Sequence, residues 1–144
     1  MKNNLYSFKS ITVLLPVINE EKCLIKTIEI LLKNNKQNIK KIFFILDKKK
    51  TQLKSKNICR GYLNSNNKVF SILYQKKKSV GGAFQDSFIK VNTTHCLIMS
   101  SDFETNPISV KKMIKFSQIN PRKIITASRW KKKKRGGGIR IINF

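Results

Sequence analysis

The sequence predicts an α/β fold built on an open, mostly parallel sheet with helices on its faces. Short apolar runs alternate along the chain with segments whose apolar residues recur at helical spacing, the order typical of a parallel sheet. The apolar runs are continuous rather than alternating, which is typical of strands buried on both faces. A length of 144 residues with 40% hydrophobic residues fits one domain with a single core.

The first half of the chain predicts three strands and two helices. Residues 11–17 form the first strand, and a turn at residues 18–20 ends it. A helix is expected next, with acids near its start, where the helix dipole favours them. Its inward face consists of apolar residues at i, i+4, i+7 and i+8: Leu24, Ile28, Leu31 and Leu32. Residues 41–46 are the second strand, residues 51–63 the second helix and residues 69–74 the third strand.

The second half predicts two further helices and two further strands. After Gly81 and Gly82, a third helix is expected to face inward with Phe84, Phe88 and Val91, and residues 95–100 form the fourth strand. Asn106 is the expected N-cap of a fourth helix that has Pro107 at its first position. The inward residues of this helix are Val110, Met113 and Ile114, and residues 123–128 are the fifth strand.

The composition points to anionic partners. The chain has 31 Lys and Arg against 7 Asp and Glu, a formal net charge of +24, which favours nucleic acid, an anionic membrane surface or phosphorylated ligands. Lys, Asn and Ile are all encoded by A/T-rich codons, so compositional drift is an alternative source of part of this charge. Nucleic acid is the least favoured partner, because recognition motifs and aromatic stacking strands are absent from the sequence.

The apolar runs are far shorter than the roughly 18–20 residues that span a bilayer. The N-terminus does not resemble a secretory signal, so a cytoplasmic location is expected. Three scattered cysteines without a CxxC pair predict reduced thiols rather than disulfides or a zinc site, and the single histidine, His95, is expected to be structural.

Ligands of such sheets bind outside the carboxyl ends of the strands. The chemically useful side chains follow the strands directly, so the fold would bring them to one edge, which we call the rim. The most informative segment is CLIMSSDFETNP, residues 96–107, where an apolar run ends in two serines and then Asp102 and Glu104. Two neighbouring acids in so basic a chain predict a site for a metal or a phosphate. A helix-capping or ordinary loop role is the alternative for both.

Five segments together resemble the nucleotide-sugar-dependent glycosyltransferases of family 2, which have the GT-A fold, and within them the polyprenyl-phosphate or dolichol-phosphate sugar transferase branch. The resemblance covers about residues 10–144. In order along the chain, the segments are ITVLLPVINEE (11–21), FFILD (43–47), VGGAF (80–84), IMSSDFETNP (98–107) and ASRW (127–130). The resemblance implies a Rossmann-like GT-A domain over residues 10–130, after an N-terminal tail at residues 1–9.

The resemblance also implies roles for individual residues. A nucleotide-diphosphate sugar would be held by Pro16, Asn19, Glu20, Asp47, Gly81 and Gly82, with Asp47 contacting the base or ribose. Asp102, helped by Glu104, would hold Mg²⁺ or Mn²⁺ at the donor diphosphate, and Arg129 would lie near a donor or acceptor phosphate. The acceptor would be a polyprenyl phosphate or a glycan. Apart from the resemblance, three basic runs that each follow a strand (48–50, 76–78 and 131–135) are expected to attract the donor diphosphate, a lipid phosphate or the cytoplasmic face of an anionic membrane; a solvated lysine surface is the alternative.

The sequence departs from the family pattern at three places. Ser100 replaces the first Asp of the Asp-x-Asp element, and Lys48 to Lys50 follow Asp47 where the family often has another acid and a glycine. The chain also ends soon after the Ser-Arg motif, so residues 131–144 are expected to be a basic, Gly-rich loop and the start of a truncated acceptor-side segment.

Three functions fit the sequence: a sugar transferase, a catalytically incomplete nucleotide-sugar-binding domain and a basic nucleic-acid-binding protein.

Structural alternatives also stay open for most of the proposed site residues. Asn19 and Glu20 suit a helix start, Gly81 and Gly82 suit a tight turn, and Asp47 could pair with a neighbouring lysine.

Overall fold

The computed structural model describes residues 7–65, 68–128 and 138–142. Its elements follow one another as β1 (Ile11–Val17), α1 (Lys22–Asn35), β2 (Ile39–Leu46), α2 (Leu53–Asn64), β3 (Phe70–Tyr74), α3 (Ser79–Phe88), β4 (His95–Ile98), a 3₁₀ turn (Pro107–Ser109), α4 (Val110–Ile119), β5 (Ile124–Ser128) and β6 (Gly138–Ile142). The predicted alternation of strands and helices is thus confirmed as far as β5.

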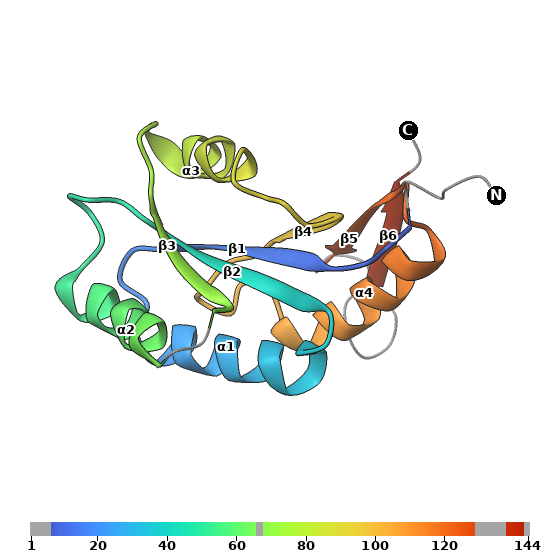
Figure 1. Cartoon of the computed structure of the whole chain (residues 1–144), viewed down its shortest axis with the longest axis horizontal. Helices are drawn as coiled ribbons and strands as arrows, with labels where there is room; N and C mark the ends of the chain where they lie inside the picture. Colours follow the sequence, from blue (N-terminus) through green and yellow to red (C-terminus); the bar gives the residue numbers. More distant parts are fainter. Residues whose placement is uncertain (1–6, 66–67, 129–137, 143–144) are drawn as a thin grey trace.

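Four strands form one parallel sheet in the order β3-β2-β1-β4 (Figure 1). Helices α1, α2 and α4 cover one face of this sheet and α3 covers the other, so the molecule has three layers. The predicted α/β class with an open, mostly parallel sheet is confirmed. Within the described residues, no helix combines the length and the apolar character needed to cross a bilayer.

The larger core lies between the sheet and α1, α2 and α4. Alternate residues of β1 and β2 point into it and meet the apolar faces of the helices, including Leu24, Ile28 and Leu31 of α1. The smaller core, on the α3 side, contains Leu14, Phe43, Ile45 and Ala83. Strands β1 and β2 bury side chains on both faces, as their continuous apolar sequences predicted.

The start of α4 also agrees with the sequence. The Asn106 side chain accepts a hydrogen bond from the backbone N–H of Ile108 at 2.9 Å, and Pro107 occupies the first position of the 3₁₀ turn that leads into the helix. Val110 and Ile114 are buried, and Met113 packs against the same core. The ring of His95 lies 4.9 Å from that of Phe8, and its Nε2 lies 3.0 Å from the Pro121 carbonyl oxygen.

The expectation that residues 123–128 form a fifth strand of the parallel sheet is wrong. β5 pairs in antiparallel fashion with β6 in a separate two-stranded sheet. The expected basic loop at residues 131–138 lies outside the described residues except for Gly138, which begins β6. Strand β6 was missed because its sequence, GIRII, follows a run of glycines and lysines that is typical of a loop.

Two burial predictions also fail on the α3 side of the sheet. Phe88 is 44% exposed, and α3 buries the small residues Gly82, Ala83 and Ser87 instead. Strand β4 alternates rather than being buried on both faces, because Cys96 and Ile98 are exposed while Leu97 is buried. Helix α3 contacts β1 and β2, so its small residues approach those strands and β4 keeps an uncovered face.

Candidate functional site

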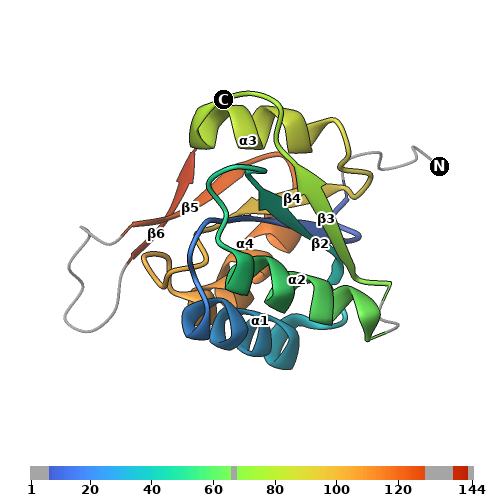
Figure 2. The ribbon, with the colours of Figure 1, turned by 90° about the vertical axis from the view of Figure 1, so that its left-hand side faces the viewer.

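The strand order points to the carboxyl ends of β1 and β4 as the place for a ligand. From β1 the chain passes to β2 on one side and, later, to β4 on the other, so the direction of winding reverses between β1 and β4. Ligands of open α/β sheets bind at such a reversal. Figure 2 shows this end of the sheet facing the viewer, with α3 above it and α1 and α2 below. The rim predicted from the sequence is this edge.

The loop after β4 holds the two conspicuous acids. Ser101 donates a hydrogen bond from its hydroxyl to the Pro16 carbonyl at 2.6 Å and thereby joins the end of β4 to β1. Asp102 is exposed, and its Oδ1 accepts a hydrogen bond from the Glu104 backbone N–H at 2.9 Å. Phe103, between them, has a left-handed φ of 68°. The loop therefore presents both carboxylates to solvent near the carboxyl ends of β1 and β4.

Ser100, which the sequence resemblance places at the first Asp of the Asp-x-Asp element, closes this loop. Its Oγ lies 3.0 Å from Thr105 Oγ1 and accepts a hydrogen bond from the Thr105 backbone N–H at 3.1 Å. The Ser100 backbone N–H donates to Thr105 Oγ1 at 3.0 Å. These bonds tie the two ends of the loop together, so the Ser100 hydroxyl acts in loop closure.

The turn after β1 is organised by Glu20. Its Oε2 accepts hydrogen bonds from the backbone N–H groups of Ile18 at 2.7 Å and Asn19 at 3.1 Å. Glu20 therefore stabilises the turn between β1 and α1, ahead of the N-cap position at Glu21, and Asn19 stays exposed. Pro16 lies in β1, where its carbonyl receives the Ser101 bond.

Asp47, at the end of β2, is held from several sides. Its Oδ1 accepts hydrogen bonds from the backbone N–H groups of Lys49 at 2.8 Å and Lys50 at 3.0 Å, and its Oδ2 accepts one from Gln75 Nε2 at 3.1 Å. The Lys50 and Lys49 backbone bonds lower the pKa of the Asp47 carboxyl. The carboxylate is thus kept ionised and is fixed in position between β2 and β3.

Thr51 connects Asp47 to β1. The Asp47 backbone N–H donates to Thr51 Oγ1 at 2.9 Å, and the Thr51 hydroxyl donates to the Val17 carbonyl at 2.7 Å. Gln52 N–H donates to the Ile18 carbonyl at 2.7 Å. The loop after β2 and the turn after β1 therefore form one bonded unit.

The loop between β3 and α3 is fixed by Asp86. Asp86 Oδ2 accepts hydrogen bonds from the backbone N–H groups of Lys76 at 2.6 Å and Lys77 at 2.8 Å. These bonds, that from Lys77 first, lower the pKa of the Asp86 carboxyl. Gly82 is buried under the loop, and a Cβ built on it would lie 2.7 Å from Lys77 Cβ. Gly82 is therefore required for close packing, whereas Gly81 is exposed.

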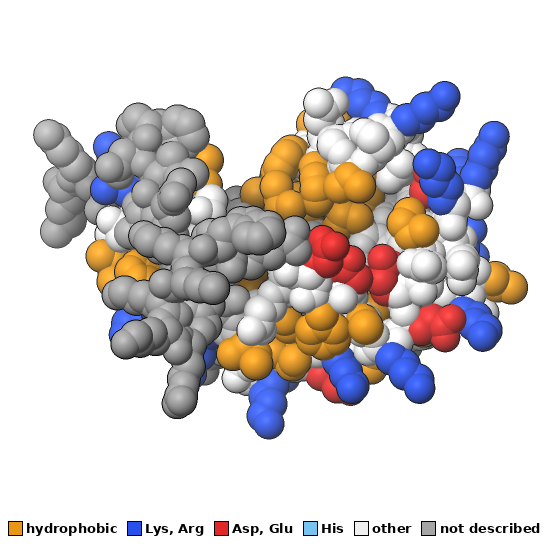
Figure 3. Space-filling view, turned by 180° about the vertical axis from the view of Figure 1, so that it is seen from behind, with side chains coloured by type: hydrophobic (Ala, Val, Ile, Leu, Met, Phe, Trp, Pro, Cys, Tyr) orange, Lys and Arg blue, Asp and Glu red, His pale blue; other side chains and the backbone are white. Residues whose placement is uncertain are grey.

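The structure brings most of the predicted site residues to one rim. Hydrogen bonds connect the segments that carry Pro16, Asn19, Glu20, Asp47 and Asp102. Seen from behind, acidic side chains gather near the middle of the surface, with hydrophobic side chains above and below them (Figure 3). The lysines at positions 48–50 and 76–78 are all exposed. Arg129 and the lysines at 131–134 lie outside the described residues.

The carboxylates after β4 fit a hard divalent cation. Mg²⁺ prefers oxygen ligands and is commonly held by one or two protein carboxylates together with substrate phosphates, which is the donor set that Asp102 and Glu104 supply. In the part of the chain that the structure describes, no three His, Cys, Asp or Glu side chains cluster as metal ligands. A metal held by Asp102 and Glu104 would complete its coordination with waters and substrate phosphates.

Sequence reasoning missed three residues that organise the rim: Thr51, Gln75 and Asp86. Gln75 is the first residue after β3 and could have been found by inspecting that position, but the lysines beside it dominated the sequence. Thr51 and Asp86 act on loops distant in the chain, at separations of 34 and 10 residues. Only the folded structure reveals these contacts.

A comparison with family models finds one that covers nearly the whole chain. The family described as "Glycosyl transferase family 2" matches residues 12–142. This range includes the four parallel strands, apart from Ile11 at the start of β1, and every residue of the candidate site. A search of curated proteins finds no match.

Proposed function

The chain belongs to glycosyl transferase family 2, and from this premise we propose that it transfers a sugar from a nucleotide-diphosphate sugar to a lipid phosphate or a glycan. Members of the family generally use nucleotide-sugar donors and divalent metals. The polyprenyl-phosphate branch is our choice within the family, on the sequence resemblance of the five segments described above.

One observation carries the proposal most directly. Asp102 lies exposed in the loop after β4, beside the point where the sheet reverses its winding direction, and Ser101 anchors that loop to β1. A donor diphosphate bound at the carboxyl ends of β1 and β4 would lie within reach of Asp102, which would hold it through a shared cation. Bound Mg²⁺ or Mn²⁺ would supply charge neutralisation to the diphosphate, with Asp102 and Glu104 as its protein ligands.

Asp47 is the proposed contact to the base or ribose of the donor. A carboxylate offers about four lone-pair sites, and three of those on Asp47 already accept hydrogen bonds. A remaining site can accept one N–H or O–H from the nucleoside. Because Gln75 and two backbone N–H groups hold the Asp47 carboxylate in place, its free lone pair is already positioned before the nucleoside binds.

The proposed reaction is a displacement at the anomeric carbon. An acceptor oxygen forms a new bond to this carbon, the bond to the diphosphate oxygen breaks, and the nucleoside diphosphate leaves with the electron pair, which inverts the anomeric configuration. A lipid phosphate attacks with an oxygen that is already anionic and needs no general base, whereas a hydroxyl acceptor must lose a proton. Arg129 is proposed to neutralise a phosphate of donor or acceptor.

The exposed lysines of the rim support a phosphate acceptor. Residues 48–50 and 76–78 follow β2 and β3, so both runs belong to the edge that carries the candidate site. They are proposed to attract the donor diphosphate, a lipid phosphate or the cytoplasmic face of an anionic membrane. Replacing these lysines with glutamine should weaken liposome or nucleotide binding, and unchanged affinity for both would remove this part of the proposal.

A thermal-shift panel tests the donor site. UDP- and GDP-sugars should raise the melting temperature of the wild type in the presence of Mn²⁺, because a ligand that binds only the folded state stabilises it. Asp102→Asn should lose the metal-dependent part of this shift. Glu29→Gln, an exposed change on α1, is the control and should respond as the wild type does. Absence of any metal-dependent shift in the wild type would contradict the proposal.

A second candidate is a nucleotide-sugar-binding domain that does not catalyse transfer. It is favoured by the contacts of Ser100, whose hydroxyl is used to close the loop rather than to replace the carboxylate of the family pattern. Donor turnover with metal and acceptor separates the two functions. Binding without turnover supports the second candidate. Salt-dependent nucleic-acid binding without any response to nucleotide sugars would favour a basic nucleic-acid-binding protein instead.

A further inference from the structure

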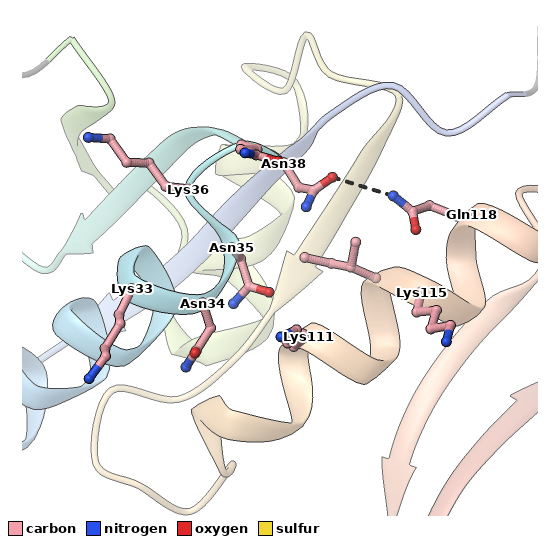
Figure 4. A pocket seen from close by; sticks show the side chains of 10 residues that line it. Lys33, Asn34, Asn35, Lys36, Asn38, Lys111, Lys115 and Gln118 are labelled. Carbon is pink, nitrogen blue, oxygen red and sulfur yellow. Dashed lines mark hydrogen bonds between the residues drawn. The ribbon is translucent and has the colours of Figure 1, made fainter.

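A basic cleft opens at the edge of the sheet opposite the candidate site. It has a volume of about 630 Å³ and lies between the end of α1, with the loop before β2, and helix α4 (Figure 4). Lys33 and Lys36 line it from the α1 side, and Lys111 and Lys115 line it from α4. Five amide side chains and Ile114 complete the lining, which contains no acidic residue. We call this the amino-edge cleft.

Local helix energetics do not explain the lysines of α4. Lys111 lies in the first turn of the helix, where the helix dipole disfavours a positive charge. Lys115 follows four residues later, so the two like charges occupy neighbouring positions on one helical face and destabilise it. The sequence of α4, VKKMIKFSQI, contains no acid to compensate them. Lys33, in contrast, lies in the last turn of α1, where the dipole favours it.

The amide side chains give the cleft a fixed polar wall. Asn35 is only 3% exposed, and its Nδ2 donates to the Leu31 carbonyl at 3.1 Å. Gln118 Nε2 of α4 lies 3.5 Å from Asn38 Oδ1, a long hydrogen bond that joins the two walls at one end. Figure 4 shows Asn35 directed toward α4 between these walls. The cleft is therefore a defined concavity rather than a set of independent surface lysines.

We propose that the amino-edge cleft binds a small ligand with two or more linked phosphate groups. Two lysines border the cleft on each side, and an occupant with more than one negative charge could engage all four once Lys33 and Lys36 turn inward from the directions seen in Figure 4. Positive charge around a concave surface focuses the electrostatic field and raises the local concentration of anions. The volume lies within the roughly 300–1,000 Å³ of small-molecule sites. This site is separate from the rim, and the inference does not depend on the proposed transferase activity.

Tripolyphosphate is the probe that tests this inference. Titration calorimetry should show binding to the wild type at about 0.15 M salt. At this ionic strength the Debye length is about 8 Å, so general attraction to the basic surface is screened and the remaining binding reports a specific site. The variant Lys111→Gln with Lys115→Gln should bind tripolyphosphate about ten-fold more weakly or worse, since two charge-assisted contacts are lost. Both positions are exposed, and glutamine is a good helix former, so the fold is retained.

Lys22→Gln with Lys26→Gln is a matched control. These residues are exposed on α1, have the same spacing and charge change, and do not line the cleft. The control should bind tripolyphosphate as the wild type does. Equal losses in both double variants would show non-specific attraction and overturn the proposal, as would unchanged binding in the cleft variant. Anionic vesicles form a second arm. If vesicles bind through Lys111 and Lys115 and tripolyphosphate does not displace them, these lysines contact a membrane, and the proposal of a small phosphate ligand is also overturned.

Discussion

Gly82 and Gly81 are neighbours in α3, yet the structure predicts opposite effects when each is replaced by alanine. A Cβ at Gly82 would lie 2.7 Å from Lys77 Cβ, 2.9 Å from the Lys77 carbonyl carbon and 3.0 Å from its oxygen. Two of these three atoms are backbone, so the loop between β3 and α3 must move. A Cβ at Gly81 meets only Ser79 Oγ, at 3.8 Å, which is ordinary contact.

The size of the effect follows from two opposing contributions. Alanine in place of a helical glycine stabilises by about 0.5–1 kcal/mol, and this gain applies at both positions. Overpacking costs about 1–3 kcal/mol and applies only at Gly82, because Asp86 holds the backbone N–H groups of Lys76 and Lys77 in place. Gly81→Ala should therefore stabilise slightly, and Gly82→Ala should be about 1–3 kcal/mol less stable than Gly81→Ala.

Urea unfolding of both variants, followed by circular dichroism, measures this difference. For a domain of this size each 1 kcal/mol corresponds to about 2–4 °C in melting temperature, so thermal unfolding gives an independent estimate. Equal stability of the two variants would refute the claim that Gly82 is present for close approach of the Lys77 backbone. A Gly81→Ala variant less stable than the wild type would refute the claim of open space beside Gly81.

Three further predictions concern stability and thiol chemistry. The pKa of the Asp86 carboxyl is lower in the folded protein than its ordinary value of 3.8, so its ionised form stabilises the fold above that pH. This stabilisation is lost as the pH falls through the folded-state pKa. Asp86→Asn should therefore show a smaller fall in melting temperature than the wild type between about pH 5 and pH 2. Thr51→Val removes the buried hydroxyl that is the hydrogen-bond partner of the Val17 carbonyl and the Asp47 N–H. It should lower the free energy of unfolding, measured in urea, by about 1–3 kcal/mol. Burial raises the pKa of Cys59 to about 12, so at pH 8 iodoacetamide should label exposed Cys96 before Cys59, as measured by peptide mass spectrometry, and labelling of Cys59 first would contradict its burial.

Local signals in the sequence were sufficient for the central layers of the fold. The apolar runs of β1 and β2 left only a doubly buried strand as a reasonable interpretation, and the sequence Asn106-Pro107 marked a helix start. The position of Asp102 could also be predicted, because the loop that follows a parallel strand begins at the carboxyl edge of the sheet, although β4 ends at Ile98 rather than at residue 100.

Properties that depend on distant partners could not be derived in this way. Whether Phe88 faces the core depends on how closely α3 approaches the sheet, which the small residues of that helix decide. The apolar sequence of β5 is compatible with either sheet, and its pairing with β6 is determined by the chain that follows. Likewise, the contacts of Gln75 with Asp47 join two loops separated by 28 residues.

The parallel pairing of β1 with β4 has a consequence for how the chain folds during synthesis. Ile11 is paired with His95, so the ribosome must add 84 residues before the second neighbour of β1 exists. At about 5–20 residues per second this takes about 4–17 s, during which a strand that will be central has an unpaired, apolar edge. Nascent chains that stop before His95 should therefore need chaperone protection, and they should aggregate in its absence while the full-length chain does not.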